Sequence, residues 1–288
     1  MPSAKATKTA LARDLGVSRA SLYYKPKKPP SDAALKAKVA AVMAEHPAYG
    51  HRRVAIALGM NRKPVVRVMR IFGLKPRIRR GVRFVKPDDL GRPETRIPNV
   101  LKALCPIRAN VVWAGDFTYF WHVDRFWYVA TVIDVHTREI LGWHVANHHT
   151  TALIIEAWRD AVRRTGEAPT WFHSDQGSEY VSGAYESLLA AHGTTASQSR
   201  KGSPWQNGFQ ESFYSQFKLE IGDVRRFAHV GQLIEAVHQQ IDYYNNRRIH
   251  SAHEMPPAAY RKAQEQKIAA LAAPTGPFYS PALLVKSV

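Results

Sequence analysis

Near the middle of the chain stands the run Val111-Val112-Trp113-Ala114-Gly115-Asp116-Phe117-Thr118-Tyr119-Phe120. β-branched and aromatic residues dominate this run, which is typical of a buried strand. A single acid, Asp116, interrupts it. A carboxylate in such a segment is costly unless a cation neutralises it. The run therefore predicts a strand of the core and a candidate site on that strand.

The residues after this run alternate between strand-like and helix-like patterns. We expect strands over 111–122, 126–135, 139–145, 170–173 and 194–197. We expect helices over 151–164, 183–192, 207–221 and 230–246. Strands that come first and then alternate with helices predict an α/β fold, in which helices flank a mixed five-stranded sheet.

Two further acids follow the same logic as Asp116. Asp175 stands at the expected exit of a strand, just before Gly177, and Glu211 stands one turn into an expected helix. Three converging carboxylates can hold two hard divalent ions, Mg²⁺ or Mn²⁺ in its place, and two-metal sites cut and join phosphodiesters. Spacing alone is equally compatible with ordinary surface or turn acids. Asp134 competes for the role, but we expect it to make structural turn contacts.

Lys218 lies seven residues after Glu211, about two turns along the same helical face. It is placed to meet a phosphate beside the acids, and a solvated surface lysine is the alternative. Zinc is disfavoured because Cys105 is the only cysteine and no histidine pair has structural-zinc spacing.

The basic charge is concentrated in the first part of the chain. Of the net +18, residues 1–110 contribute +19 and residues 111–288 contribute −1. A basic part joined to a nearly neutral part predicts a polyanion-binding module attached to a different one. A generally basic protein is the alternative.

Five segments divide the chain. Residues 1–26 have a helix-turn-helix pattern, and a plain helical hairpin is the alternative. Residues 32–74 form a second helix-turn-helix unit, and residues 75–110 form a basic connector that either follows phosphates or acts only as a linker. Residues 111–228 form the catalytic core, and residues 229–288 form a C-terminal helix and a tail.

Several arginines are candidate DNA contacts, because basic side chains on helices and flexible arms bind phosphates and bases. Together with Lys218, these candidates are Arg19, Arg52, Arg53, Arg67, Arg70, Arg77, Arg79, Arg80, Arg83, Arg247 and Arg248.

No run of 18 apolar residues and no signal-peptide pattern is present, so we expect no membrane partner. A single thiol fits a reducing cytoplasm. We therefore expect a cytoplasmic, nucleoid-associated protein.

Several motifs together resemble a known family. These motifs lie at residues 46–53, 113–119, 173–180, 201–211 and 244–250. The chain resembles the DDE transposases of bacterial insertion sequences, of the OrfB type from the OrfA/OrfB frameshifting group, whose core is shared with retroviral integrases. Two positions depart from the pattern: Gly115 stands where threonine is common, and Gln206 stands where a second acid often occurs.

The resemblance implies a ribonuclease-H-like core with Asp116, Asp175 and Glu211 as its catalytic and metal-binding residues. It implies cleavage of element 3′ ends and their transfer to DNA with two Mg²⁺ ions. It also implies double-stranded DNA as the partner, a homo-oligomer on paired ends and a possible OrfA protein. A DNA-binding partial transposase or inhibitor without strand transfer, and a plain nuclease, are the alternatives.

Overall fold

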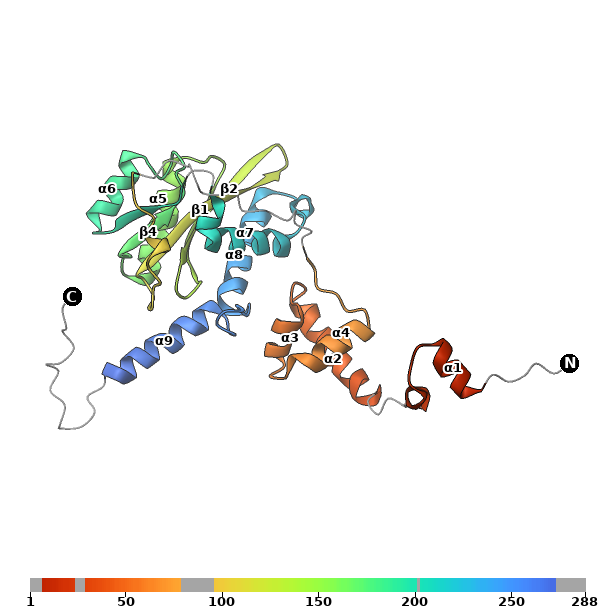
Figure 1. Ribbon diagram of the computed structural model, residues 1–288. Helices are drawn as coiled ribbons and strands as arrows, with labels where there is room; N and C mark the ends of the chain where they lie inside the picture. The colour runs from red at the N-terminus through yellow and green to blue at the C-terminus, as the bar shows by residue number, and fades with distance from the viewer. Residues whose placement is uncertain (1–6, 24–28, 79–95, 201–202, 273–288) are drawn as a thin grey trace, which may run out of the picture.

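The computed structural model describes residues 7–23, 29–78, 96–200 and 203–272. Its centre is one sheet of five strands: β1 (Val112–His122), β2 (Arg125–Asp134), β3 (Ile140–Ala146), β4 (Trp171–Ser174) and β5 (Thr195–Gln198). The spatial order is β3-β2-β1-β4-β5 (Figure 1). β1, β2 and β3 are antiparallel neighbours, whereas β4 runs parallel to β1 and β5 runs parallel to β4. The predicted mixed five-stranded sheet with flanking helices is confirmed.

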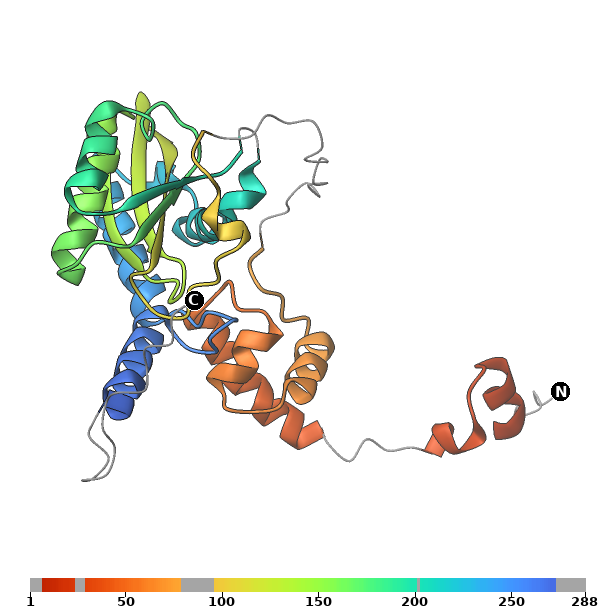
Figure 2. The same ribbon diagram turned by 60° about the vertical axis from the view of Figure 1, so that its left-hand side comes forward.

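Helices cover both faces of this sheet, as Figure 2 shows. One face packs against α5 (Thr151–Thr165) and α6 (Gly183–Ala191), and the other packs against α7 (Gly208–Ile221) and α8 (Val230–Asn246). Alternate residues of β1 serve the two layers, with Trp113 beside Trp158 of α5 and Val112 and Ala114 on the side of α7. Burial on both faces explains the apolar start of β1, whereas Tyr119 and Trp121 further along the strand are exposed.

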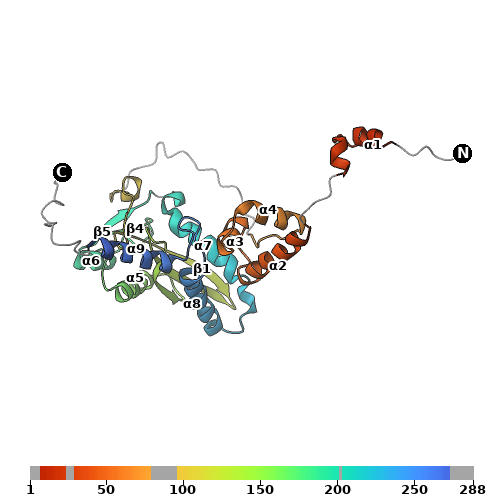
Figure 3. The ribbon, with the colours of Figure 1, turned by 90° about the horizontal axis from the view of Figure 1, so that it is seen from below.

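A separate helical unit precedes the core (Figure 3). It contains α2 (Pro29–Glu45), α3 (His51–Ala57) and α4 (Arg62–Ile71), which pack around Val39, Tyr49, Val54, Val65 and Val68. The Tyr49 hydroxyl accepts a hydrogen bond from the backbone N–H of Ile249 at 2.6 Å. His46 Nδ1 and the Tyr243 hydroxyl lie 2.7 Å apart. The helical unit therefore contacts the end of α8 through specific polar groups.

Three expectations about the helices need correction. The second helix of the first unit is not an α-helix: α1 (Lys8–Asp14) is followed by a 3-10 helix, η1 (Arg19–Tyr23). α2 begins at Pro29 rather than Asp32, because proline is tolerated in the first turn of a helix. The tail contains a further helix, α9 (Pro257–Ala272). Its alanine-rich sequence has good helix propensity but only a weak amphipathic pattern.

Short 3-10 helices complete the described chain: η2 (Val100–Lys102), η3 (Pro204–Asn207) and η4 (Val224–Arg226). Among the described residues, no helix combines the length and the apolar composition needed to cross a bilayer.

The contact between β3 and α5 makes a stability prediction at Gly142. A Cβ at this position would lie 2.3 Å from both the Ala157 carbonyl oxygen and the Ala161 backbone nitrogen. Gly142→Ala should therefore lower the free energy of unfolding by about 1–3 kcal/mol through overpacking. Gly183→Ala is the control, because a Cβ there meets nothing within 4 Å. Equal melting temperatures for the two variants would contradict the close packing of α5 on β3.

Candidate active site

Asp116 and Asp175 lie where β1 and β4 separate. The two strands pair only from Val112 to Ala114, and the last pair joins Ala114 to His173. Asp116 stands two residues beyond Ala114, and Asp175 stands two residues beyond His173. The two carboxylates therefore leave neighbouring parallel strands at the same level. Such a divergence at the carboxyl ends of strands is where open α/β sheets bind ligands.

Local backbone contacts orient both aspartates. Asp116 Oδ1 accepts a hydrogen bond from the N–H of Phe117 at 2.8 Å, and Asp175 Oδ1 accepts one from the N–H of Gly177 at 2.9 Å. A side chain at Gly177 would crowd Asp175, because a Cβ there would lie 3.1 Å from Asp175 Oδ1. Glycine thus leaves room for the carboxylate to fold back on its own turn.

Glu211 reaches the same place because its two helical neighbours fasten α7 to the sheet. Gln210 is fully buried, and its Nε2 donates to the carbonyl oxygens of Ala114, at 2.6 Å, and of Thr131, at 3.0 Å. The Tyr214 hydroxyl donates to the carbonyl oxygen of Asp116 at 2.7 Å. These bonds tie α7 to carbonyl oxygens of residues that β1 and β2 pair with each other, in the interior of the sheet.

The three acids line one pocket of about 650 Å³. Lys218 lines the same pocket, with Nζ 4.9 Å from the centre of the Tyr119 ring. The remaining wall is largely polar and is made by Thr118, Gln176, Ser199, Arg200, Ser203, Asn207 and Ser215 among others. The structure therefore brings Asp116, Asp175, Glu211 and Lys218 together from three elements.

The electrostatics of the pocket are unfavourable for a carboxylate without a cation. Burial first, and then the nearby charges of Asp175 and Glu211, raise the pKa of Asp116 to about 7, against a lowering by the Phe117 N–H. Burial and like charge both penalise the ionised form. A cation bound between the acids would relieve both effects.

The donor set suits a hard cation, since three carboxylates offer only oxygen ligands. Within residues 7–23, 29–78, 96–200 and 203–272, however, no three His, Cys, Asp or Glu side chains lie close enough together to hold one ion. The acids share a pocket rather than a preformed single-ion cage.

Gly115, one of the two departures from the family pattern, has a packing reason. A Cβ there would lie 2.4 Å from Cζ of the Phe172 ring, so the ring fills the space that a side chain would need. Asp116 thus follows a residue without a side chain, with no loss of packing in the core.

Asp134, the competing acid, makes the structural turn contacts that we expected. It is fully buried and accepts hydrogen bonds from the backbone N–H groups of Asn110, His136 and Thr137, at 2.7, 3.0 and 2.7 Å, and from the Thr137 hydroxyl. Its oxygens are therefore committed to the turn between β2 and β3.

The predicted DNA contacts fall into three groups. The exposed ones are Arg19, Arg52, Arg70, Arg77 and Arg247, while Arg79, Arg80 and Arg83 lie outside the described residues. Arg248 needs correction, because it is buried and its Nε donates to Glu220 Oε1 at 2.8 Å. Arg67 forms an ion pair with Asp32, 2.5 Å apart, and Arg53 is partly buried. The Arg67 side chain remains 40% exposed beside this ion pair, so its contact with DNA stays a prediction.

Sequence reasoning missed the anchoring roles of Gln210 and Tyr214. The available signal was a glutamine four residues before a tyrosine on an otherwise apolar face, since i and i+4 residues share a face. It also missed Glu179, a buried acid that lies near the pocket but is 2.8 Å from His149 Nδ1.

Known proteins resemble this chain in sequence. A family model described as an integrase core domain matches residues 106–204, and a second integrase core domain model matches residues 192–257. The transposase of insertion sequence element IS904 from Lactococcus lactis is 33% identical, over 75% of this chain and 88% of its own. The putative transposase InsK of element IS150 from Escherichia coli is 31% identical, over 83% and 87%.

Among solved structures, the HTLV-2 integrase catalytic core domain in complex with magnesium is 16% identical with a TM-score of 0.38, over 50% of this chain and 92% of that chain. The sequence relatives cover most of both lengths. The chain therefore belongs to the insertion-sequence transposases with an integrase core domain, which are DDE polynucleotidyl transferases.

Proposed function

We propose that this transposase cleaves the 3′ ends of its insertion sequence and transfers those strands to DNA, using Asp116, Asp175 and Glu211. The observation that carries this proposal is their convergence on one pocket from β1, the end of β4 and α7. Three acids that belong to separate elements, one of them with a raised pKa, are typical of a functional site rather than of a solvated surface.

Two Mg²⁺ ions would be held by these carboxylates, with Mn²⁺ as a substitute. Asp116, Asp175 and Glu211 would hold these ions together, because the charges of Asp175 and Glu211 both act on Asp116. When bound, the metal pair supplies activation of the attacking oxygen and stabilisation of the leaving 3′-oxygen.

The remaining residues of the pocket orient the DNA strand. Lys218 carries its charge on the same helix as Glu211 and at the same pocket, where it would hold a phosphate next to the scissile one. Hydroxyl and amide groups such as Thr118, Ser199 and Asn207 offer further hydrogen bonds to backbone oxygens.

The helical unit α2–α4 would bind the element ends. Arg52 lies in the first turn of α3, Arg70 lies in the last turn of α4, and both side chains are exposed. Double-stranded DNA with the terminal repeats and the target is therefore the proposed partner. Pairing two ends calls for more than one copy of the chain, so we propose a homo-oligomer on DNA, with an OrfA protein as a further candidate partner.

Removing a carboxylate should abolish the chemistry while preserving the fold. Asp116→Asn or Glu211→Gln should lower cleavage of labelled terminal-repeat DNA in Mg²⁺ by about 1,000-fold, since several kcal/mol of transition-state stabilisation are lost. Glu235→Gln, an exposed acid of α8, is the control and should retain wild-type rates. Joined products separate a transposase from a nuclease. Undiminished cleavage by the Asp116 variant would contradict the proposal.

The raised pKa of Asp116 predicts how stability depends on pH. Because the folded-state pKa is about 7 against an ordinary 3.8, the metal-free protein should lose stability as pH rises from about 4 to 7. In EDTA, Asp116→Asn should therefore melt higher than wild type at pH 8, by about 2–4 °C per kcal/mol relieved, and the difference should vanish at pH 4. Mg²⁺ at pH 8 should stabilise wild type more than the variant. Parallel pH profiles of the two proteins would refute this explanation.

DNA binding by the helical unit predicts a change in salt dependence. Arg52→Gln combined with Arg70→Gln should reduce the magnitude of the slope of log Kobs against log salt by about 2, since each phosphate contact contributes about 0.9. Arg159→Gln, an exposed arginine of α5 paired with Glu156, is the matched control. An unchanged slope measured by fluorescence anisotropy would show that these two side chains do not contact phosphate.

A further inference from the structure

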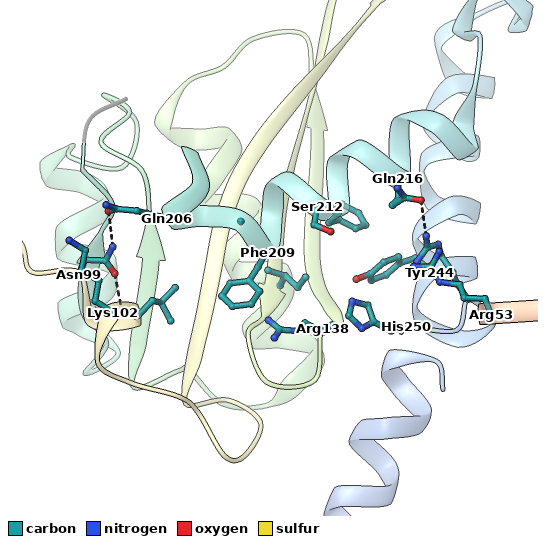
Figure 4. A pocket seen from close by; sticks show the side chains of 15 residues that line it. Arg53, Asn99, Lys102, Arg138, Gln206, Phe209, Ser212, Gln216, Tyr244 and His250 are labelled. Carbon is teal, nitrogen blue, oxygen red and sulfur yellow. Dashed lines mark hydrogen bonds between the residues drawn. The ribbon is translucent and has the colours of Figure 1, made fainter. Parts of the chain in front are cut away.

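A second pocket, of about 490 Å³, lies on the other side of α7 (Figure 4). Glu211 and Lys218 line the pocket of the three acids, whereas Phe209, Ser212 and Gln216 of the same helix line the second pocket. The other walls come from η2, from the turn between β2 and β3, from the C-terminal end of α8 and from α3. Its size is that of a small-molecule or nucleotide site.

The second pocket is basic. Arg53, Lys102, Arg138 and Arg248 line it, and no carboxylate does. Arg248 is already neutralised, because Glu220 accepts from its Nε and Gln216 accepts from its Nη2 at 3.0 Å. Among the described residues, the other three cations have no ion pair. The pocket therefore presents positive charge that no acid of its own wall compensates.

Arg138 is held in the pocket at a conformational cost. Its φ of 67° lies in the left-handed region, which costs a residue with a side chain roughly 1–2 kcal/mol. Its guanidinium lies 3.9 Å from the centre of the Phe209 ring, and its Nη1 is buried without a hydrogen-bond partner in the described structure. Burial lowers the pKa of Arg138. Backbone strain concentrates at ligand sites. The strained backbone and the unsatisfied guanidinium of Arg138 therefore indicate a ligand site.

Arg53 adds a second unsatisfied group from the helical unit. Its Nε is buried without a hydrogen-bond partner among the described residues, and burial, followed by the charge of Arg248, lowers its pKa. Lys102 stands exposed at the opposite end of the pocket. Guanidinium groups offer a fork of donors that matches phosphate oxygens, and an anion would compensate the charge of all three side chains.

Apolar and aromatic side chains complete the pocket. Leu101, Ile133, Phe213 and Tyr244 line it beside the cations. Burial lowers the pKa of His250 to about 3, so this histidine remains neutral and offers only a hydrogen bond. A ligand that combines an anion with a flat or apolar body fits such a wall better than an inorganic ion does.

We propose that this pocket binds a short nucleotide segment, with a phosphate beside Arg138, its sugar and base against the apolar wall, and Arg53 and Lys102 attracting its negative charge from the two ends. The nucleotide is either part of a DNA strand or free in solution. The site is distinct from the three acids and needs none of their chemistry.

Two variants test the proposal without loss of the fold. Arg138→Gly removes the guanidinium and relieves the left-handed strain, and Lys102→Gln changes an exposed side chain. Arg159→Gln is the control. In one arm, a 5′-phosphorylated thymidine dinucleotide is titrated calorimetrically into the full chain in EDTA. In the other arm, the salt slope for a labelled DNA duplex is measured under the same conditions.

We expect either variant to weaken dinucleotide binding at least about 10-fold, or to lower the magnitude of the DNA salt slope by about 1, with the control unchanged. A change in the first arm alone identifies a free nucleotide as the ligand, and a change in the second alone identifies a DNA strand. The proposal is overturned if both variants match wild type in both arms. Because no metal is present, this result is independent of the cleavage assay.

Discussion

The site depends on the side-chain hydrogen bonds that fasten α7 to the sheet. Gln210 donates to the carbonyls of β1 and β2, and Tyr214 donates to the carbonyl of Asp116 itself. These carbonyls belong to residues that β1 and β2 pair with each other, so the side chains of α7 are tied to the interior of the sheet. The same bonds fix the rotation of α7, so Glu211 faces the acids of β1 and β4. The position of the third carboxylate thus depends on these bonds.

The opposite side of α7 faces a different environment. One side meets three carboxylates, of which Asp175 and Glu211 help to raise the pKa of Asp116, and the other side meets a pocket lined by cations and by no acid. Each pocket favours a ligand of the opposite charge: the pocket of the three acids favours a metal cation, and the second pocket favours a phosphate. The ion pair between Arg248 and Glu220 lies beside the second pocket. It neutralises Arg248, so one of the four cations that line this pocket has a structural partner.

The sequence predicted the core well, because strand and helix periodicities there are strong. The expected strand over 111–122 and helix over 207–221 differ from β1 and α7 by one residue at one end. The local sequence pattern did not predict features that depend on contacts between residues distant in the sequence. It could not show that Glu220 captures Arg248, 28 residues away, or that β1 outlasts its pairing with β4. α9 was missed because its apolar residues follow no clear face. The convergence of the acids follows from the resemblance and the topology together, not from spacing.

The central claim is that Asp116, Asp175 and Glu211 form one divalent metal site of two ions. Electron paramagnetic resonance of Mn²⁺, titrated into the full chain with terminal-repeat DNA, counts bound ions and detects coupling between them. The account predicts about two coupled Mn²⁺ ions per chain in the wild type and loss of the coupled signal in Asp116→Asn. An identical count and an identical coupling in both proteins would contradict it.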